Sequence, residues 1–331
     1  MKKFLLVVFF LFPLLSYSQQ ELKTDDKIRI AEGLKMSEFV SDNIWKGWSK
    51  TNFTILFLSD SLEYLINHPN PSEDFTQSYF DSYLNTKVYI RKKVFQENSL
   101  ATFPAVNGIN TVVVGTPENT GRSSISWTIT LLHEHFHQYQ FNLKNYFDKL
   151  NNLDLSNGDN SGMWVLNYNF AYEDTSVNRA FNDLKIKLHD AYTESGIKSF
   201  KKKTIEYLKA KKDFKNLVSE KDSKYLEFQL WQEGLARYTE YTVLSYLTKN
   251  KYKPSDDFTK LKDYEPLEQN YEKRINKLKD ELQKVNLAEQ KRVCFYSMGA
   301  IEGLVLDRYQ KSWRNKYTKN MFNTSNLFIF K

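Results

Sequence analysis

Three of the five histidines in this chain of 331 residues fall within five consecutive positions, and residues 133 to 137 match the pattern His-Glu-x-x-His. A four-residue step in an α-helix turns by about 400°, so His133 and His137 lie about 40° apart on one face. Two imidazoles placed in this way can bind one tetrahedral zinc ion, and Glu134 beside them can act as general base on a metal-bound water. His135 is rotated by about 200° from His133, so we do not expect it to be a ligand.

The motif lies in a helix-compatible window from Trp127 to Tyr139. Good N-cap residues at Ser123–Ser126 predict that the helix begins there, and we expect it to continue through Asn145. In a chain so poor in histidine, an accidental match to the motif is expected on the order of once in a few hundred chains. The pattern therefore favours a zinc site over the alternative, which is a solvated histidine-rich helix surface.

A catalytic zinc site needs a third protein ligand, with the fourth position left for water. The downstream candidates are the acidic residues and His189. Among them Glu233 stands out, because it is followed by the small residues Gly234 and Ala236. These would let its helix lie close to the motif helix, as a short carboxylate side chain requires. Glu233 is therefore the first candidate for the third ligand, with His189 and the other acidic residues still open, and Zn²⁺ is the expected cofactor.

The two segments together resemble the gluzincin clan of zinc metallopeptidases, in particular its peptidase MA-like members. In that clan a helical His-Glu-x-x-His is followed, after a variable insert, by a Glu-Gly-x-Ala-x-Tyr helix, which residues 233–238 match. The resemblance implies that His133, His137 and Glu233 bind zinc. It also implies that Glu134 is the general base in the hydrolysis of a peptide bond.

The group that stabilises the oxyanion formed during hydrolysis is less sharply indicated. Tyr238, Tyr241 and His189 are the candidates, and the family pattern favours Tyr238 because it includes that tyrosine. The chain departs from many relatives at Arg237, where they carry an acidic residue, and it has no Gly-x-Met-Glu-Asn exopeptidase motif. The substrate class therefore stays open.

Two further expectations concern the surroundings of the zinc site. Gluzincins commonly bind an extended peptide along an edge strand before the motif helix, and Thr111–Gly115 occupies that place here. The alternative for this segment is an ordinary buried strand. Glu240 could orient a histidine, but a surface ion pair with Arg237 is the interpretation that its spacing favours.

The elements that must position these residues change in type along the chain. Strands are predicted at Phe53–Leu58, Lys87–Phe95 and Ile109–Gly115, with a helical stretch starting near Ser61 between the first two. Beyond about Ser176 the sequence is mainly helical. It includes an amphipathic helix with a solvated basic face at Ile197–Val218 and a helical hairpin formed by Leu267–Val285 and Leu287–Tyr309.

Strands first and helices afterwards predict an α+β fold that is mainly α. With the family resemblance, we expect a zincin-like subdomain at 19–150, which holds a small sheet and the motif helix. A helical subdomain at 151–331 would then carry the third zinc ligand.

The N-terminus has the build of a secretory signal peptide over residues 1–18, with Lys2 and Lys3 before the apolar run Phe4–Leu15. Its removal takes away two lysines and no acid, so the formal net charge falls from +7 to +5. We do not expect an exported protein with this small charge to bind nucleic acid. No later stretch is apolar enough to serve as a transmembrane anchor. The single cysteine, Cys294, excludes an intramolecular disulfide and a cysteine-built metal site.

These features together predict an exported zinc-dependent metallopeptidase, periplasmic or extracellular, with a peptide or protein substrate. Two alternatives use the same ligands. One is a zinc hydrolase of a non-peptide amide, and the other is a non-catalytic zinc-binding scaffold protein on a zincin fold.

Overall fold

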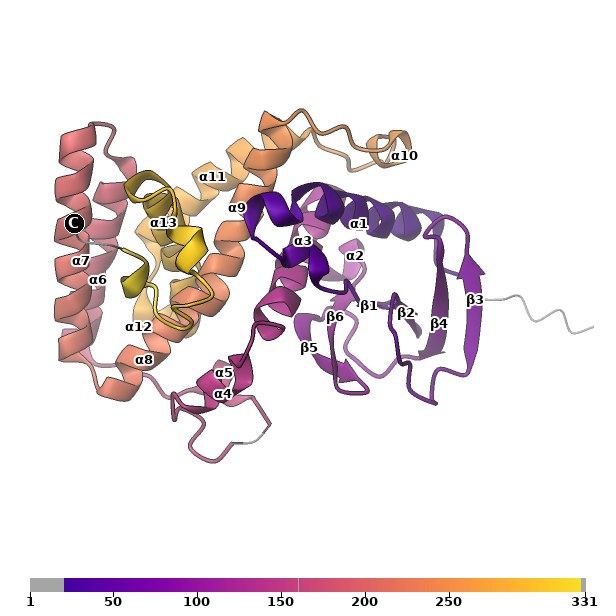
Figure 1. Cartoon of the computed structure of the whole chain (residues 1–331), viewed down its shortest axis with the longest axis horizontal. Helices are drawn as coiled ribbons and strands as arrows, with labels where there is room; N and C mark the ends of the chain where they lie inside the picture. Colours follow the sequence, from indigo (N-terminus) through magenta and orange to yellow (C-terminus); the bar gives the residue numbers. More distant parts are fainter. Residues whose placement is uncertain (1–20, 160, 329–331) are drawn as a thin grey trace, which may run out of the picture.

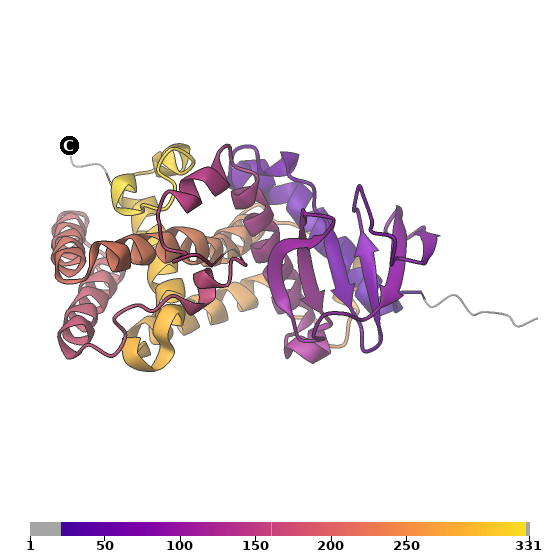
Figure 2. The same ribbon diagram turned by 90° about the horizontal axis from the view of Figure 1, so that it is seen from below.

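The computed structural model describes residues 21–159 and 161–328, so the signal peptide expected at 1–18 lies outside the described residues. The fold is mixed α+β and mainly helical, with 58% helix and 11% strand, which confirms the expected class. In Figure 1 the sheet lies at one end of the molecule and the helices of the second half at the other. The view from below in Figure 2 shows the same division, with the indigo and magenta strands apart from the orange and yellow helices.

The sheet has six strands in the order β3-β4-β2-β1-β6-β5. Their bounds are β1 Ile55–Leu58, β2 Leu62–Ile66, β3 Gln77–Asp81, β4 Thr86–Lys92, β5 Leu100–Val106 and β6 Ile109–Gly115. The pairing of β1 with β6 is parallel, and the other pairs are antiparallel. Strand β6 therefore connects the four antiparallel strands β1–β4 to strand β5.

The helix expected from Ser61 is wrong, because Leu62–Ile66 forms strand β2 between β1 and β4. Tyr64 and Ile66 belong to the apolar cluster on the helix-covered face of the sheet, whereas Leu65 belongs to the cluster on the opposite face. This alternation is the two-residue period of a strand with both faces covered.

The expectation that Thr111–Gly115 forms an edge strand is also wrong. These residues belong to β6, which lies inside the sheet between β1 and β5. The edge strand next to β6 is β5, for which the sequence predicted no strand. Strand β5 contains Pro104 and a register shift between Phe103 and Val106. Proline lacks the N–H that an inner strand needs, so it is confined to edges and bulges.

The motif helix is α3, Ser124–Phe141. Its N-cap is Ser123, whose side chain accepts a hydrogen bond from the backbone N–H of Ser126, as predicted. The helix ends earlier than expected, because Asn145 has a positive φ of 61° and begins a new helix, α4 Tyr146–Asn151. Helix α3 packs on β5 and β6, and α1, Thr24–Ile44, packs against α3.

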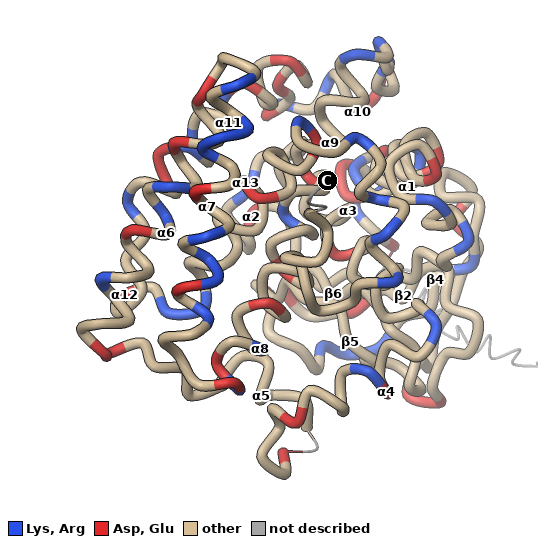
Figure 3. Tube along the Cα trace, turned by 60° about the vertical axis from the view of Figure 1, so that its left-hand side comes forward, with Lys and Arg blue, Asp and Glu red and all other residues tan. Residues whose placement is uncertain are grey.

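The second half contains the long helices α6 Thr175–Thr193, α7 Ile197–Leu217, α8 Glu220–Gln229, α9 Leu235–Lys249, α11 Leu267–Lys284 and α13 Cys294–Tyr309. Shorter helices are α2 Pro117–Thr120, α5 Trp164–Asn167, α10 Asp256–Thr259 and α12 Leu287–Gln290. The predicted second arm of the hairpin is broken, because Lys291 has a positive φ of 50° between α12 and α13. In Figure 3 basic and acidic positions are interspersed along α6, α7 and α11.

One cluster of buried apolar side chains extends from the sheet through α3 into the helices of the second half. A smaller cluster covers the other face of the sheet. The motif helix therefore lies in a core that both halves of the chain share. Within the described residues, no helix combines the length and the apolar character that crossing a membrane requires.

Candidate metal centre

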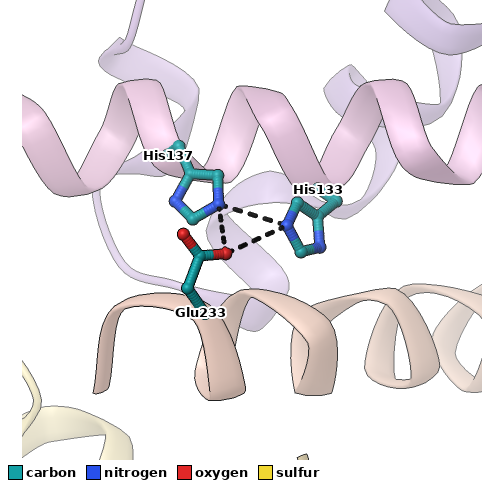
Figure 4. Close-up of side chains that lie close together, drawn as sticks. All are labelled: His133, His137 and Glu233. Atoms are coloured by element: carbon teal, nitrogen blue, oxygen red, sulfur yellow. Dashed lines mark hydrogen bonds and ion pairs between the residues drawn. The ribbon is translucent and has the colours of Figure 1, made fainter. Parts of the chain in front are cut away.

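Helix α3 presents His133 and His137 on one face, one turn apart, as the four-residue spacing predicts. Both side chains are buried, with 8% and 5% of the residue surface exposed. Their Nε2 atoms lie 3.1 Å apart. Figure 4 shows both rings pointing from α3 toward the helix that carries Glu233.

Glu233 completes a cluster of three possible ligand atoms. Its Oε2 lies 3.4 Å from Nε2 of His137 and 4.0 Å from Nε2 of His133. In a tetrahedral site with ligand atoms about 2.0–2.2 Å from the ion, those atoms lie about 3.3–3.6 Å apart. Two of the three separations are thus close to those that a single ion requires, and only the His133–Glu233 pair is wider.

Glu233 is positioned by a π-helical turn, Leu230–Gly234, between α8 and α9. Such turns add a residue to a helix and occur frequently at functional sites. The next residue, Gly234, contacts Gly299 of α13, where a Cβ atom on either glycine would lie 2.5 Å from the Cα atom of the other. The expectation that Gly234 faces the motif helix is therefore wrong. Consecutive helical residues are about 100° apart, so Gly234 and Glu233 face different neighbours.

The other ring nitrogen of His133 bonds to a carboxylate. Nδ1 lies 2.9 Å from Oε1 of Glu240, whose Oε2 accepts a hydrogen bond of 2.5 Å from Arg274. Burial alone would raise the pKa of Glu240, but the His133 hydrogen bond and the Arg274 charge lower it to about 2. Glu240 is therefore a carboxylate that accepts from Nδ1–H, which leaves the Nε2 lone pair of His133 for a metal.

The surface pair expected between Glu240 and Arg237 is wrong, because Arg237 donates to Glu281 instead. The other interpretation of Glu240, as the residue that orients a histidine, agrees with the structure. The two bonded residues, His133 and Glu240, are 107 positions apart in the chain.

His137 is oriented by amides rather than by a carboxylate. Its Nδ1 lies 2.6 Å from Oε1 of Gln140, whose Nε2 donates to the backbone carbonyls of Trp231 and Gln232. Nδ1 also lies 3.0 Å from Nε2 of Gln232, so both amide contacts of the ring involve Nδ1, and Nε2 is the nitrogen that faces Glu233. Because Gln140 also binds the π-helical turn, it holds His137 and the Glu233 backbone in one network.

The cluster favours a positive charge between its members. Burial lowers the pKa of His137, but the charge of Glu233 overrides that effect and raises the pKa to about 9. Burial alone would raise the pKa of Glu233, and the charge of His137 lowers it to about 2. A proton or a divalent cation would supply the charge that this site stabilises.

Glu134 follows His133 on α3 and is also buried, with 6% of its surface exposed. Its Oε2 accepts a hydrogen bond of 2.9 Å from the hydroxyl of Thr102 on β5. Its carboxylate is not one of the three grouped ligand atoms. The charge of Glu134 nevertheless acts on His137, so the carboxylate lies near the cluster without belonging to it.

Tyr296 and Arg292, two residues that the sequence did not single out for the site, lie beside Glu233. The charge of Glu233 acts on Tyr296, and the Tyr296 hydroxyl accepts a hydrogen bond of 2.7 Å from Arg292. Burial, and then the charge of Glu233, raise the pKa of Tyr296 well above its usual value, so the hydroxyl stays protonated.

The structure does not bring Tyr238 to the cluster. Its side chain is fully buried, and its hydroxyl donates to Asp307 at 2.7 Å and accepts from Arg314. Tyr238 lies five residues after Glu233, which turns it about 140° away around the helix. Its expected catalytic role is therefore corrected to that of a buried link from α9 to α13 and to the segment that follows α13.

The remaining candidates also have partners elsewhere. The charge of Arg237 acts on Tyr241, and His189 accepts from Gln283 with Nε2 at 2.9 Å. His135 faces away from the cluster as predicted, with its ring stacked on Phe53 at a centroid distance of 3.8 Å. Of the five histidines, only His133 and His137 face Glu233.

Comparison of the chain with protein-family models, with curated proteins and with solved structures found no match.

Proposed function

We propose that this chain is an exported zinc-dependent metallopeptidase of the gluzincin type, with a zincin-like sheet and motif helix. One observation carries the proposal. His133, His137 and Glu233 present three ligand atoms within 4.8 Å of one another, and the charge of Glu134, which is not among them, acts on His137. The proposal of export rests on the signal peptide that the sequence predicts at 1–18.

The donor set fits zinc. Zinc binds imidazole nitrogen and carboxylate oxygen in tetrahedral geometry, and catalytic sites use three protein ligands with one position open. Glu240 and Gln140 hold the other nitrogen of each histidine, as partners of metal-bound imidazoles do. When bound, zinc would polarise the substrate carbonyl and lower the pKa of a water molecule.

Glu134 would move the proton in this reaction. Its carboxylate accepts a proton from the water that attacks the substrate carbonyl carbon. It then delivers the proton to the amide nitrogen as the C–N bond breaks. This role needs a carboxylate that is fixed in orientation, and the Thr102 hydrogen bond to Oε2 supplies such an anchor.

Tyr296 is the donor that we assign to the developing oxyanion, in place of Tyr238. Its protonated hydroxyl lies against Glu233, and Arg292 donates to the same oxygen. A hydrogen bond from a cationic donor makes the phenolic O–H a stronger donor. Donors already in place before charge develops give the largest stabilisation of an oxyanion.

The edge strand β5 is the place where an extended peptide would bind. Leu100–Val106 pairs only with β6, so its outer edge has free backbone groups in the described structure. An extended peptide that adds to such an edge gains backbone hydrogen bonds along its length. Thr102 on this strand bonds to Glu134, so the edge runs directly past the proposed general base.

The test is digestion of a peptide library by the zinc-loaded mature chain, with products mapped by mass spectrometry. We expect the wild type to cleave peptides, and Glu134→Gln to retain zinc while cleavage falls by about 100-fold or more. The control is Glu268→Gln, which removes the same charge from an exposed position on α11. A zinc-loaded wild type that cleaves no peptide would contradict the proposal and favour a non-peptide amide hydrolase or a scaffold protein.

A further inference from the structure

The hydroxyl of Thr102 lies between the edge strand and the motif helix. Oγ1 is 2.9 Å from Oε2 of Glu134 and also 2.9 Å from the backbone carbonyl oxygen of the same residue. Thr102 pairs with Val112 of β6 in the strand register. One hydroxyl thus contacts both the side chain and the main chain of Glu134.

The strand determines where this hydroxyl points. Leu100 packs into the apolar cluster that includes α3, whereas Phe103 packs into the cluster on the opposite face of the sheet. Side chains two positions apart share a face of a strand, so Thr102 faces α3 together with Leu100. Threonine also has a stiff χ1 torsion, which holds its hydroxyl in a fixed direction.

The two carboxylate oxygens of Glu134 differ in their contacts. Oε2 accepts from Thr102, whereas Oε1 makes no hydrogen bond to any other residue that the structure describes. Glu134 has three side-chain torsions, and one anchored oxygen removes much of that freedom. The unanchored Oε1 remains the atom that can accept a proton.

We propose that Thr102 is a positioning residue for the general base: its hydroxyl fixes Oε2 of Glu134 so that Oε1 faces the water. This inference rests on the proposed peptidase function and goes beyond it by naming a residue outside the motif. A misplacement of about 1 Å in a reacting group can cost about 100-fold in rate. The loss of the hydroxyl should therefore lower kcat more than it changes KM.

The same hydroxyl has a second contact, to the backbone of α3, which would make Thr102 a purely structural link between strand and helix. The two roles predict different kinetics. A structural link predicts a lower melting temperature, with any loss of activity following the loss of folded protein. A positioning role predicts a lower kcat in a fully folded, zinc-loaded enzyme.

The experiment compares Thr102→Val and Thr102→Ser in the zinc-loaded mature chain, on a peptide that the wild type cleaves. We expect Thr102→Val to lower kcat by about 10- to 100-fold, with KM within about threefold and zinc content unchanged. Thr102→Ser keeps a hydroxyl and should recover kcat to within a few-fold of wild type. If Thr102→Val does not fold, Thr102→Ala is used in its place.

The matched control is Thr111→Val on the neighbouring strand β6. Its hydroxyl donates to the backbone carbonyl of Ile109 and does not contact the site, so its kcat should equal that of wild type. A Thr102→Val enzyme with wild-type kcat, beside an inactive Glu134→Gln enzyme, would overturn the inference and leave the proposed function intact. A zinc-loaded wild type without activity would overturn both.

Discussion

At the scale of single residues, the two histidines differ in what holds them. Nδ1 of His133 bonds to the carboxylate of Glu240, and Nδ1 of His137 bonds to the amide oxygen of Gln140. The spacing of the motif predicted that His133 and His137 share one face and that His135 points away from them. It did not predict the role of Glu240, because the nearby Arg237 is an equally suitable partner in sequence.

Glu240→Gln tests the importance of the charged partner. The substitution removes the negative charge beside His133 and leaves Arg274 without its carboxylate. Partners of this kind typically contribute 10- to 100-fold in metal affinity, so we expect the zinc dissociation constant to rise by about 10- to 100-fold. Competition with a fluorescent zinc chelator measures this dissociation constant.

Glu281→Gln is the control for that measurement, because Glu281 is bonded to Arg237 and not to a histidine. Its zinc affinity should equal that of wild type. Equal affinities for Glu240→Gln and wild type would show that the charge of Glu240 contributes nothing to the site.

At the scale of secondary-structure elements, the position of Glu233 depends on the π-helical turn Leu230–Gly234 and its contact with α13. Small residues at Gly234 and Gly299 signalled close helix packing in the sequence. The sequence did not predict which helices would pack together. A glycine indicates that another backbone packs closely at its position, but it does not identify the element to which that backbone belongs. A π-helical turn likewise has no sequence signature that separates it from an α-helix.

Gly299→Ala tests this contact. The added Cβ atom would lie 2.5 Å from Cα of Gly234 and 2.8 Å from the carbonyl oxygen of Leu230, and both are backbone atoms of the π-helical turn. Overpacking of this kind costs about 1–3 kcal/mol, so the melting temperature should fall by several degrees, on the order of 5 °C.

The comparison is with Gly33→Ala on α1, where the added Cβ atom would meet Cδ2 at the end of the Leu131 side chain. A flexible side-chain end can move, so the melting temperature should fall less in this variant. Calorimetry measures the melting temperature of both variants. An unchanged melting temperature in Gly299→Ala would refute the close contact between α13 and the turn.

At the scale of the whole molecule, the sequence predicted the fold class, the motif helix and most long helices, because their apolar periodicity is a local property. The strands were predicted less well. Strand β5 carries Pro104, which argues against a strand unless it lies at an edge or a bulge. That β6 lies inside the sheet depends on its parallel pairing with β1, which is separated from it by four other strands in sequence.

Long-range polar contacts were also outside the reach of sequence analysis. Lys211 lies on the lysine-rich helix α7, for which a solvated basic face was expected, yet it is buried. Its Nζ lies 2.7 Å from Oε1 of Glu302 on α13 and 2.7 Å from the hydroxyl of Thr324. An ammonium group so buried needs such partners, and both lie far along the chain.

The claim on which the account depends is that α3 and the π-helical turn together bind one metal ion. The most direct measurement is zinc content by plasma mass spectrometry after dialysis of the mature chain against zinc, with Glu233→Ala and the control Glu281→Ala beside it. We predict one zinc per chain in wild type and in the control, and a sharp loss of zinc in Glu233→Ala. Wild type without zinc, or Glu233→Ala with as much zinc as wild type, would contradict the account.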